Sequence, residues 1–410
     1  MNIPKTAYVL LWFPKPSETF IFREVTDLWD MGAPMSVFTL YGELRRSLSP
    51  DMAALSKRIT RLGIPFLHRL PADIRYWWKH NRTAVKWLFK TIPVRRWRSF
   101  EVGGENLWAF LCGFTLARQF REQSIRHIHA PWANGPATAA WVASKLTGIP
   151  FSFTGRAVDI YPPDGALEEK IRDATFVRTN TGTNVAYLKA VAGEFSEKIH
   201  LIYNGHTLRS YQDAPVTMRS PFRLLSLGRF ARFKGYDVLL RALSALHRRG
   251  FDFQLTMAGS GVRGVTLKAL SSRLGLDGRV SFPGYIPHDR VSELFRSTDV
   301  FIMPSVVHST GEKDGIPNVI MEALLHRVPV VATDVSGIAE VIQDRETGLL
   351  VRQRDEVGLA EAITRMVSDR DAALEMARKG KDRVLKLFDP ETNHRRVMAL
   401  IAEHSSPRGA

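Results

Sequence analysis

The sequence predicts an α/β protein built from two similar domains, each an open, doubly wound parallel sheet with helices on both faces. Short apolar runs alternate with amphipathic stretches along most of the chain, a pattern typical of parallel strands joined by helices. A length of 410 residues suits two or three domains of roughly 150 residues each. Hydrophobic residues make up 45% and charged residues 24%, which excludes wholesale disorder.

The apolar runs place strands in both halves of the chain. The apolar run at residues 7–13 is short for a signal-peptide core and is followed by Pro14-Lys15-Pro16, so we expect it to form the first buried strand. In the first half we expect strands near Tyr8–Trp12, Ser36–Leu40, His127–Ala130, Phe151–Thr154 and Phe176–Thr179. In the second half we expect Arg223–Leu227, Gln254–Ala258, Val280–Phe282, Val300–Met303, Val330–Thr333 and Leu349–Val351. Helices fit between them, for example at Tyr236–Arg249, His288–Arg296, Pro317–Arg327 and Val357–Ser368.

Polar and turn-forming residues dominate Tyr203–Pro221, which marks the boundary between the domains. We expect an N-terminal domain at residues 1–208 and a C-terminal domain at 209–386. A last helix within 387–410 is expected to return to the N-terminal domain. Doubly wound sheets bind ligands at the carboxyl ends of their strands, so the active site is expected in the cleft that the two domains face.

The positive charge of the chain is concentrated in two blocks. The net charge is +16, and residues 51–100 hold 12 basic and 2 acidic residues, whereas residues 201–250 hold 9 and 2. In the first block Trp77, Trp78, Trp87 and Trp97 interleave with basic residues: Arg75, Lys79, Arg82, Lys86, Lys90, Arg95, Arg96 and Arg98. Three interpretations are open: an anionic membrane surface, a helical hairpin whose tryptophans pack on the core, or single-stranded nucleic acid. The last has no zinc-finger or RNA-recognition signature to support it.

Composition also limits the possible chemistry. The single cysteine, Cys112, excludes an internal disulfide framework and a Cys-rich zinc site. No apolar stretch approaches the roughly 18 residues that a membrane span needs; the longest is Leu107–Ala117. No His/Asp cluster has metal-ligand spacing, so we expect neither a metal nor another cofactor.

The first chemical motif is Ser226–Gly235, in which a strand ends at Gly228 and a helix begins near Gly235. The loop between them carries Arg229, Arg232 and Lys234. Cations at a helix N-terminus form an anion site together with backbone N–H groups, and a diphosphate is the natural occupant. The alternative for such a loop on its own is a solvated turn.

The second motif runs from Asp314 to Ala323. Gly315 allows the backbone to approach a ligand, and Pro317 suits a first helical turn. Glu322 follows Asp314 by eight residues, and its carboxylate can accept hydrogen bonds from the two hydroxyls of a ribose. The alternative is a solvated surface charge, but the apolar neighbours of Glu322 indicate a buried helix, where an unpaired charge is costly.

In this order and at this spacing, the two motifs resemble the C-terminal half of a family-4 retaining glycosyltransferase with the GT-B architecture. The resemblance runs from about Phe222 to Phe388 and includes the segments at 257–261, 280–285, 299–305 and 347–350. It implies that Arg229 and Lys234 bind the donor diphosphate, that Asp314 contacts the donor sugar and that Glu322 holds the ribose. We assign the remaining donor contacts to Gly315, Ile316, Pro317, Asn318 and Tyr285.

The N-terminal half resembles the branch of bacterial exopolysaccharide transferases related to the colanic-acid and amylovoran enzymes. The matching segments are 13–21, 127–137 and 147–161. Ser17 and Thr19 at a helix start could cap the helix, donate to phosphate, or do both.

Three positions depart from the pattern of the branch. Asp314 stands where Glu is usual, with Glu312 two residues earlier, and Pro131 and Arg156 stand where histidines are usual. Arg156 cannot act as a base at neutral pH, but it could clamp a phosphate or a sugar carboxylate, so we assign it to the catalytic site.

The resemblance implies hexosyl transfer from a UDP- or GDP-sugar to a polyprenyl-diphosphate-linked oligosaccharide, with retention and without metal. It assigns acceptor binding to the N-terminal domain and nucleotide-sugar binding to the C-terminal domain, and it places the protein in the cytoplasm, on the inner face of the membrane. We expect the Arg75–Arg98 block to hold the protein there, and we expect no nucleic-acid partner. The alternatives are a non-catalytic, degenerate protein that binds lipid-linked sugar, and a nucleotide-sugar epimerase or phosphorylase of the same fold.

Overall fold

The computed structural model describes residues 3–16, 18–43, 48–95, 97, 99–161, 164–205 and 216–405. The chain divides into two compact units, here called unit 1 (Met1–Gly205 with Pro390–Ala410) and unit 2 (His206–Asp389). The expected boundaries, 208/209 and 386/387, lie close to these positions, and the first falls outside the described residues.

Unit 1 contains a seven-stranded parallel sheet in the order β3-β2-β1-β4-β5-β6-β7. Every residue of β1 is buried, as expected for a strand covered on both faces. The chain builds the sheet first in one direction from β1 and then in the other from β4, so the topological switch point lies between β1 and β4. The strands are β1 (Thr6–Leu10), β2 (Met35–Thr39), β3 (Ile59–Arg61), β4 (His127–Ala130), β5 (Phe151–Gly155), β6 (Val177–Thr179) and β7 (Ile199–Leu201).

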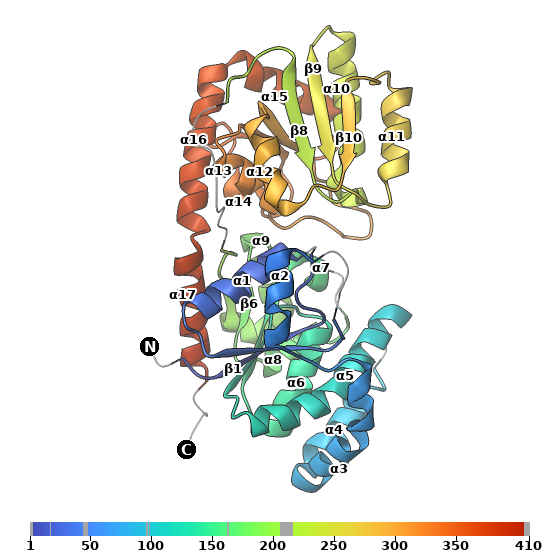
Figure 1. Ribbon diagram of the computed structural model, residues 1–410, viewed down its shortest axis with the longest axis vertical. Helices are drawn as coiled ribbons and strands as arrows, with labels where there is room; N and C mark the ends of the chain where they lie inside the picture. The colour runs from blue at the N-terminus through green and yellow to red at the C-terminus, as the bar shows by residue number, and fades with distance from the viewer. Residues whose placement is uncertain are drawn as a thin grey trace. The chain divides into compact units, whose positions relative to one another are not determined.

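Helices surround this sheet, and α3, α4 and α5 lie together at one end of unit 1 (Figure 1). The helices are α1 (Thr19–Asp30), α2 (Pro50–Leu55), α3 (Leu70–His80), α4 (Arg82–Thr91), α5 (Phe100–Glu122), α6 (Gly135–Thr147), α7 (Ala157–Ile160), α8 (Leu167–Asp173), α9 (Gly182–Ala192) and α17 (Pro390–Glu403). Short 3₁₀ helices are η1 (Ser56–Arg58), η2 (Ile64–His68) and η3 (Gly193–Lys198). The last helix, α17, packs beside α1, and its Val397 and Ile401 cluster with Phe176 and Ile202 of unit 1.

Unit 2 contains a six-stranded parallel sheet in the order β10-β9-β8-β11-β12-β13, whose switch point lies between β8 and β11. The strands are β8 (Phe222–Leu227), β9 (Phe253–Ala258), β10 (Val280–Gly284), β11 (Val300–Met303), β12 (Val330–Thr333) and β13 (Leu349–Val351). The helices are η4 (Arg232–Lys234), α10 (Tyr236–Arg248), α11 (Gly264–Arg273), α12 (His288–Arg296), α13 (Asn318–Leu325), α14 (Ile338–Val341), α15 (Glu356–Ser368) and α16 (Arg370–Leu387). Figure 1 shows β8, β9 and β10 side by side in this unit.

The predicted fold class, two doubly wound parallel sheets, is confirmed. Each of the eleven expected strands overlaps an observed one, and residues 7–10 of the apolar run at 7–13 lie in β1, a buried strand. Sequence reasoning missed β3 and β7, which have three residues each. Among the described residues, no helix is both long and apolar enough to cross a membrane.

The tryptophans of the basic block have two different environments. Trp77 is 1% exposed, and its Nε1 donates a hydrogen bond to the carbonyl of Phe114 at 3.0 Å. Trp87 and Trp97 are partly buried and pack against the core of unit 1. Trp78, in contrast, is 44% exposed. The alternative of a helical hairpin whose tryptophans pack on the core therefore describes three of the four tryptophans, and among these four only Trp78 faces solvent.

Candidate active site

The two chemical motifs of unit 2 meet at the switch point of its sheet. The loop after β8 carries Arg229 and Lys234, and the loop after β11 leads to Asp314. The amide of Val306 donates to the carbonyl of Phe233 at 2.8 Å, which holds the two loops against each other. Gly235 has φ +62°, and a Cβ at this position would lie 2.0 Å from the carbonyl oxygen of Pro304. Only glycine therefore allows this close approach.

Lys234 and Asp314 form an ion pair between these loops. Lys234 Nζ lies 2.9 Å from Asp314 Oδ1, and the two side chains are only 10% and 11% exposed. The hydroxyl of Ser305 donates to Asp314 Oδ2, and the hydroxyl of Thr333 donates to the carbonyl of Ser305. The aspartate is thus held on both oxygens. Glu312, the other carboxylate considered from the sequence, is exposed in the loop that precedes Asp314, and its carbonyl accepts a hydrogen bond from the amide of His308.

Arg229 lies next to the same loop and is exposed to solvent. Its Cζ is 5.6 Å from the centroid of the Phe233 ring, and Lys234 Nζ is 5.9 Å from the same centroid. Within the part of the chain that the structure describes, Arg229 makes neither a side-chain hydrogen bond nor an ion pair to protein. Two cations therefore approach one aromatic ring at the carboxyl end of β8, and one of them has no anionic partner there.

The remaining residues of the second motif form the start of α13. Pro317 occupies the N-cap position, one residue before the helix, and no side chain caps the first turn. Gly315 and Ile316 lie half-buried in the preceding loop, and Asn318 is the first helical residue. The first N–H groups of α13 are thus directed to the carboxyl end of β11.

Glu322 lies on the helix that the sequence predicted to be buried. It is 5% exposed, and Ile320, Met321, Ala323, Leu324 and Leu325 around it are buried as well. A carboxylate so deep in α13 requires partners, which excludes the solvated surface charge. The role of Glu322 in holding the ribose stays a prediction.

Tyr285 occupies a different position in the sheet. It follows β10, an edge strand that β9 separates from β8, and it is 64% exposed. Among the described residues, Tyr285 has no hydrogen bond, ion pair or ring contact with Lys234, Asp314 or Glu322. The structure does not bring it together with the other predicted donor residues, and its role stays a prediction.

In unit 1, Arg156 is buried rather than open to a ligand, with 4% of it exposed. Its Nη1 donates to Asn204 Oδ1 at 2.7 Å, and its Nε donates to the carbonyl of Pro131 at 3.3 Å. The guanidinium carbon lies 4.7 Å from the ring centroid of Phe20 and 5.5 Å from that of Trp132. A clamp on phosphate or carboxylate would require Arg156 to leave these partners, so its catalytic role stays a prediction.

Arg156 belongs to a buried charge network that sequence reasoning missed. Glu24 accepts hydrogen bonds from the Tyr8 hydroxyl at 2.6 Å and from Arg178 Nη1 at 2.7 Å, and Arg156 Nη2 lies 3.7 Å from the same carboxylate. Burial alone raises the pKa of Glu24, but the charges of Arg178 and then Arg156 outweigh burial and hold the pKa well below its ordinary value of 4.5. The network fixes β1, α1 and β6 at the carboxyl end of the sheet. Its sequence signal is weak, because Glu24 is one of several charges in α1 and only Arg178 is a single charge in an apolar strand.

The predictions for the start of α1 have mixed outcomes. Ser17 lies outside the described residues. The capping role expected for Thr19 is wrong, because the helix begins at Thr19 itself and Glu18 occupies the N-cap position without a side-chain cap.

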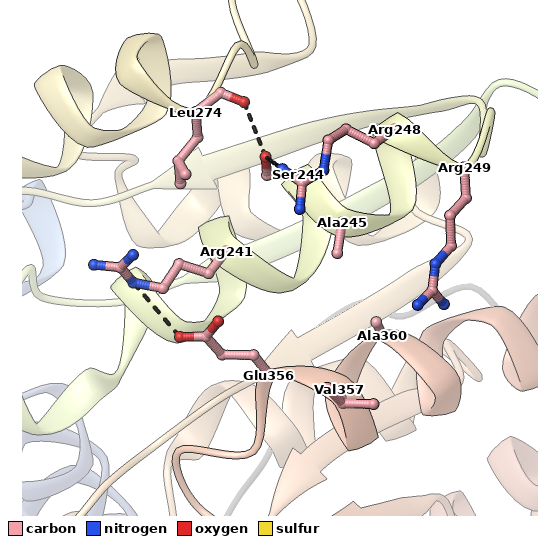
Figure 2. Close-up of a pocket in the computed structure, with 9 residues that line it drawn as sticks. All are labelled: Arg241, Ser244, Ala245, Arg248, Arg249, Leu274, Glu356, Val357 and Ala360. Atoms are coloured by element: carbon pink, nitrogen blue, oxygen red, sulfur yellow. Dashed lines mark hydrogen bonds and ion pairs between the residues drawn. The ribbon is translucent and has the colours of Figure 1, made fainter.

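Unit 2 also contains a groove lined by cationic side chains of α10, shown in Figure 2. Its volume is ≈ 200 Å³, and it is lined by Arg241, Ser244, Ala245, Arg248, Arg249, Leu274, Glu356, Val357 and Ala360. Arg248 and Arg249 stand at the C-terminal end of α10, whereas Lys234 precedes its N-terminus. Three of the nine basic residues between positions 201 and 250, Arg241, Arg248 and Arg249, therefore line this groove rather than the loop that carries Lys234.

Comparison with known proteins identifies the class to which this fold and site belong. A family model described as "Glycosyl transferases group 1" matches residues 221–369. The chain is 25% identical to WcaL of Escherichia coli, whose name assigns it as a glycosyltransferase to colanic acid biosynthesis, with 97% of this chain and 99% of WcaL covered. It is 27% identical, with the same coverage, to the amylovoran biosynthesis glycosyltransferase AmsK of Erwinia amylovora.

Solved structures agree in fold. A glycosyltransferase of Rickettsia africae superposes with a TM-score of 0.72 at 16% identity, covering 99% of this chain and 100% of that one. HepE of Anabaena, solved with UDP and glucose, superposes with a TM-score of 0.69 at 18% identity, covering 97% and 99%.

The chain is a glycosyltransferase with the GT-B fold. Over nearly its whole length it is related to the colanic acid and amylovoran biosynthesis glycosyltransferases. The names of these relatives favour a transferase over an epimerase or a phosphorylase.

Proposed function

We propose that this protein transfers a hexosyl group from a UDP- or GDP-sugar to a lipid-linked oligosaccharide, with retention of anomeric configuration, during bacterial exopolysaccharide synthesis. The observation that carries the proposal is the Lys234–Asp314 pair at the β8/β11 switch point, with Arg229 beside it. Ligands of doubly wound sheets bind at this position, and two cations at a helix N-terminus suit a diphosphate. The names of the relatives, which are glycosyltransferases of colanic acid and amylovoran biosynthesis, support a role in exopolysaccharide synthesis.

The proposed reaction is a substitution at the anomeric carbon of the donor sugar. The bond between the anomeric carbon and the diphosphate oxygen breaks, and the acceptor hydroxyl oxygen forms a new bond to that carbon from the same face. The leaving diphosphate oxygen takes the acceptor proton. Lys234 and Arg229 stabilise the negative charge that grows on the diphosphate, and such electrostatic stabilisation is usually the main contribution of a protein to the rate.

Other groups of unit 2 hold the donor in place. Glu322 accepts hydrogen bonds from the ribose hydroxyls, and Asp314 contacts the sugar once Lys234 has turned to the phosphate. In the described residues no group of three or more His, Cys, Asp and Glu could hold a metal. Independence from metal remains part of the proposal.

A thermal-shift screen tests the donor class. UDP, GDP, ADP and their common sugars are added to the protein, and we expect one nucleoside diphosphate and its sugars to raise Tm. A ligand that binds only the folded state raises the free energy of unfolding by RT ln(1 + [L]/Kd). A ligand concentration of 100 Kd therefore adds about 2.7 kcal/mol to the free energy of unfolding. Repeating the titration with EDTA should leave the shift unchanged if no metal takes part. A protein whose Tm responds to none of these nucleotides would contradict the proposed function.

We also propose that unit 1 binds an anionic membrane through one surface, called here the helical patch. The helical patch comprises the exposed apolar residues between positions 64 and 107 and the basic residues among them. The basic residues are Arg69, Arg75, Lys79, Arg82, Lys86 and Lys90, most of them exposed. Beside Trp78 an apolar groove of ≈ 440 Å³ is lined by Leu70, Pro71, Ile74, Arg75 and Trp78. The apolar residues of the patch are Ile64, Leu67, Trp78, Phe89, Val94, Phe100 and Leu107.

Vesicle sedimentation tests this surface. We expect the protein to sediment with vesicles containing phosphatidylglycerol and not with pure phosphatidylcholine, and added salt should weaken the binding. Trp78→Ala should reduce binding, because an aromatic ring at headgroup depth is lost. Val262→Ala, at an apolar residue of unit 2 that is 93% exposed, serves as the matched control. Equal sedimentation with both lipids, or an equal loss in the two variants, would count against the helical patch.

A further inference from the structure

The hydroxyl of Tyr236 is a buried polar group without a partner in the protein. Tyr236 is the first residue of α10 and is 1% exposed. Its Oη makes no hydrogen bond within the part of the chain that the structure describes. Most buried polar groups in proteins are hydrogen-bonded, and an unsatisfied one destabilises the fold, so its presence at this position requires an explanation.

The surroundings of this hydroxyl are those of the candidate donor site. A Cβ added to Gly228, at the end of β8, would lie 2.9 Å from Tyr236 Oη, 3.6 Å from Lys234 Cε and 3.7 Å from Lys234 Nζ. The tyrosine hydroxyl and the lysine ammonium therefore both lie close to the position that a Cβ on residue 228 would occupy. The Phe230 ring packs edge-on against the Tyr236 ring, with centroids 5.5 Å apart, and helps fix its direction.

The obvious acceptor nearby is already engaged. Asp314 Oδ1 is paired with Lys234, and Asp314 Oδ2 accepts from Ser305. Burial, and after it the negative charge of Asp314, raise the pKa of the Tyr236 hydroxyl far above its ordinary value of 10. The group therefore keeps its proton and can donate a hydrogen bond at any physiological pH.

We propose that Tyr236 is a donor-binding residue whose hydroxyl donates a hydrogen bond to the diphosphate of the nucleotide sugar, beside Lys234. This inference rests on the proposed function. A phosphate oxygen that draws Lys234 away from Asp314 reaches this position close to both groups, where glycine at position 228 leaves room for it. A hydrogen bond from a hydroxyl to an anionic oxygen is of the strong, charge-assisted type, and in the complex it gives the buried hydroxyl the partner that it lacks in the unliganded protein.

The variant Tyr236→Phe tests the proposal through two measurements, because we expect it to raise the stability of the unliganded protein and to weaken its binding of pyrophosphate. Without ligand, we expect the Tm of the variant to be about 2–4 °C higher, because an unsatisfied buried hydroxyl has been removed from unit 2. Pyrophosphate, which needs no knowledge of the nucleobase, should bind the variant about tenfold more weakly in isothermal titration calorimetry, the usual effect of losing one hydrogen bond to a charged group. Uridine and guanosine, which lack phosphate, should bind both proteins alike. Tyr187→Phe in α9 of unit 1 is the matched control and should change none of these values.

The outcomes separate the role of Tyr236 from that of the site. Wild-type protein that binds neither pyrophosphate nor a nucleoside diphosphate would overturn both the proposed function and this inference. Equal pyrophosphate affinity in wild type and Tyr236→Phe would overturn only the inference. A lower Tm in the unliganded variant would also overturn it, because the hydroxyl would then have a structural partner.

Discussion

Replacing Lys234 by alanine is expected to lower turnover by at least ~100-fold, the usual effect of removing one group that stabilises charge developing in the transition state. Lys234 Nζ is a largely buried cation at the switch point of unit 2, held 2.9 Å from Asp314. The charge on the leaving diphosphate grows as the glycosidic bond breaks, so the loss should fall mainly on kcat and less on the KM for the donor. Single-turnover release of nucleoside diphosphate, with membrane extract as the source of acceptor, measures the effect.

The control for this variant is Lys268→Ala on α11. Lys268 is exposed and lies 5.9 Å from the Phe282 ring centroid, and it takes no part in the proposed site. It should keep wild-type turnover. If the Lys234→Ala variant is folded by circular dichroism and keeps near-normal turnover, this result would contradict the proposal that the loop binds the donor diphosphate.

Replacing Glu24 by glutamine should destabilise unit 1 by about 3–5 kcal/mol, the cost of breaking a buried ion pair by removing one partner. Arg178 is fully buried and Arg156 is 4% exposed, so the change leaves two buried cations with one carboxylate fewer. All nine tryptophans of the protein lie in unit 1, so their fluorescence follows the urea unfolding of this unit alone. Glu122→Gln, which breaks an exposed ion pair with Arg118 on α5, should change the stability by less than about 0.5 kcal/mol. A Glu24→Gln protein as stable as this control would contradict the role of the network.

The same carboxylate predicts the acid sensitivity of unit 1. The pKa of Glu24 in the folded state lies below the unfolded value, so its stabilising contribution is fully present above the ordinary value of 4.5 and is lost as the pH falls below it toward the depressed folded value. Wild-type unit 1 should therefore lose stability more steeply in that range than the Glu24→Gln variant, as measured by urea unfolding at a series of acidic pH values.

The sequence predicted the parts of the molecule that local patterns encode. The buried strands of both sheets are continuous apolar runs, and the Lys234 and Asp314 loops could be placed because each follows such a run. Burial of Glu322 was predicted from its apolar neighbours and is confirmed. In contrast, β3 and β7 are short, and two of the three residues in each are partly exposed. Neither strand therefore contains an apolar run long enough to be recognised as a buried strand in the sequence.

What the sequence could not show depends on contacts between distant segments. Glu24 and Arg178 are 154 positions apart, and each is one charge in a segment that looks amphipathic or apolar. Local composition suggested the same exposure for Trp77 and Trp78, yet adjacent residues of a helix face different directions. Tyr236 likewise looked like an ordinary aromatic residue at a helix start, because only the fold places its hydroxyl above Gly228.

The position of α17 has a consequence for how the protein is made. Its residues Val397 and Ile401 complete an apolar cluster with Phe176 and Ile202, although the whole of unit 2 is synthesised between these two groups. On the ribosome, unit 2 can therefore fold as a continuous segment while unit 1 still lacks its last helix. Until α17 has been synthesised, Phe176 and Ile202 lack their apolar partners on this helix, so unit 1 is the half of the protein that depends on protection from aggregation. An N-terminal fragment that stops at Gly205 would have the same exposed cluster permanently.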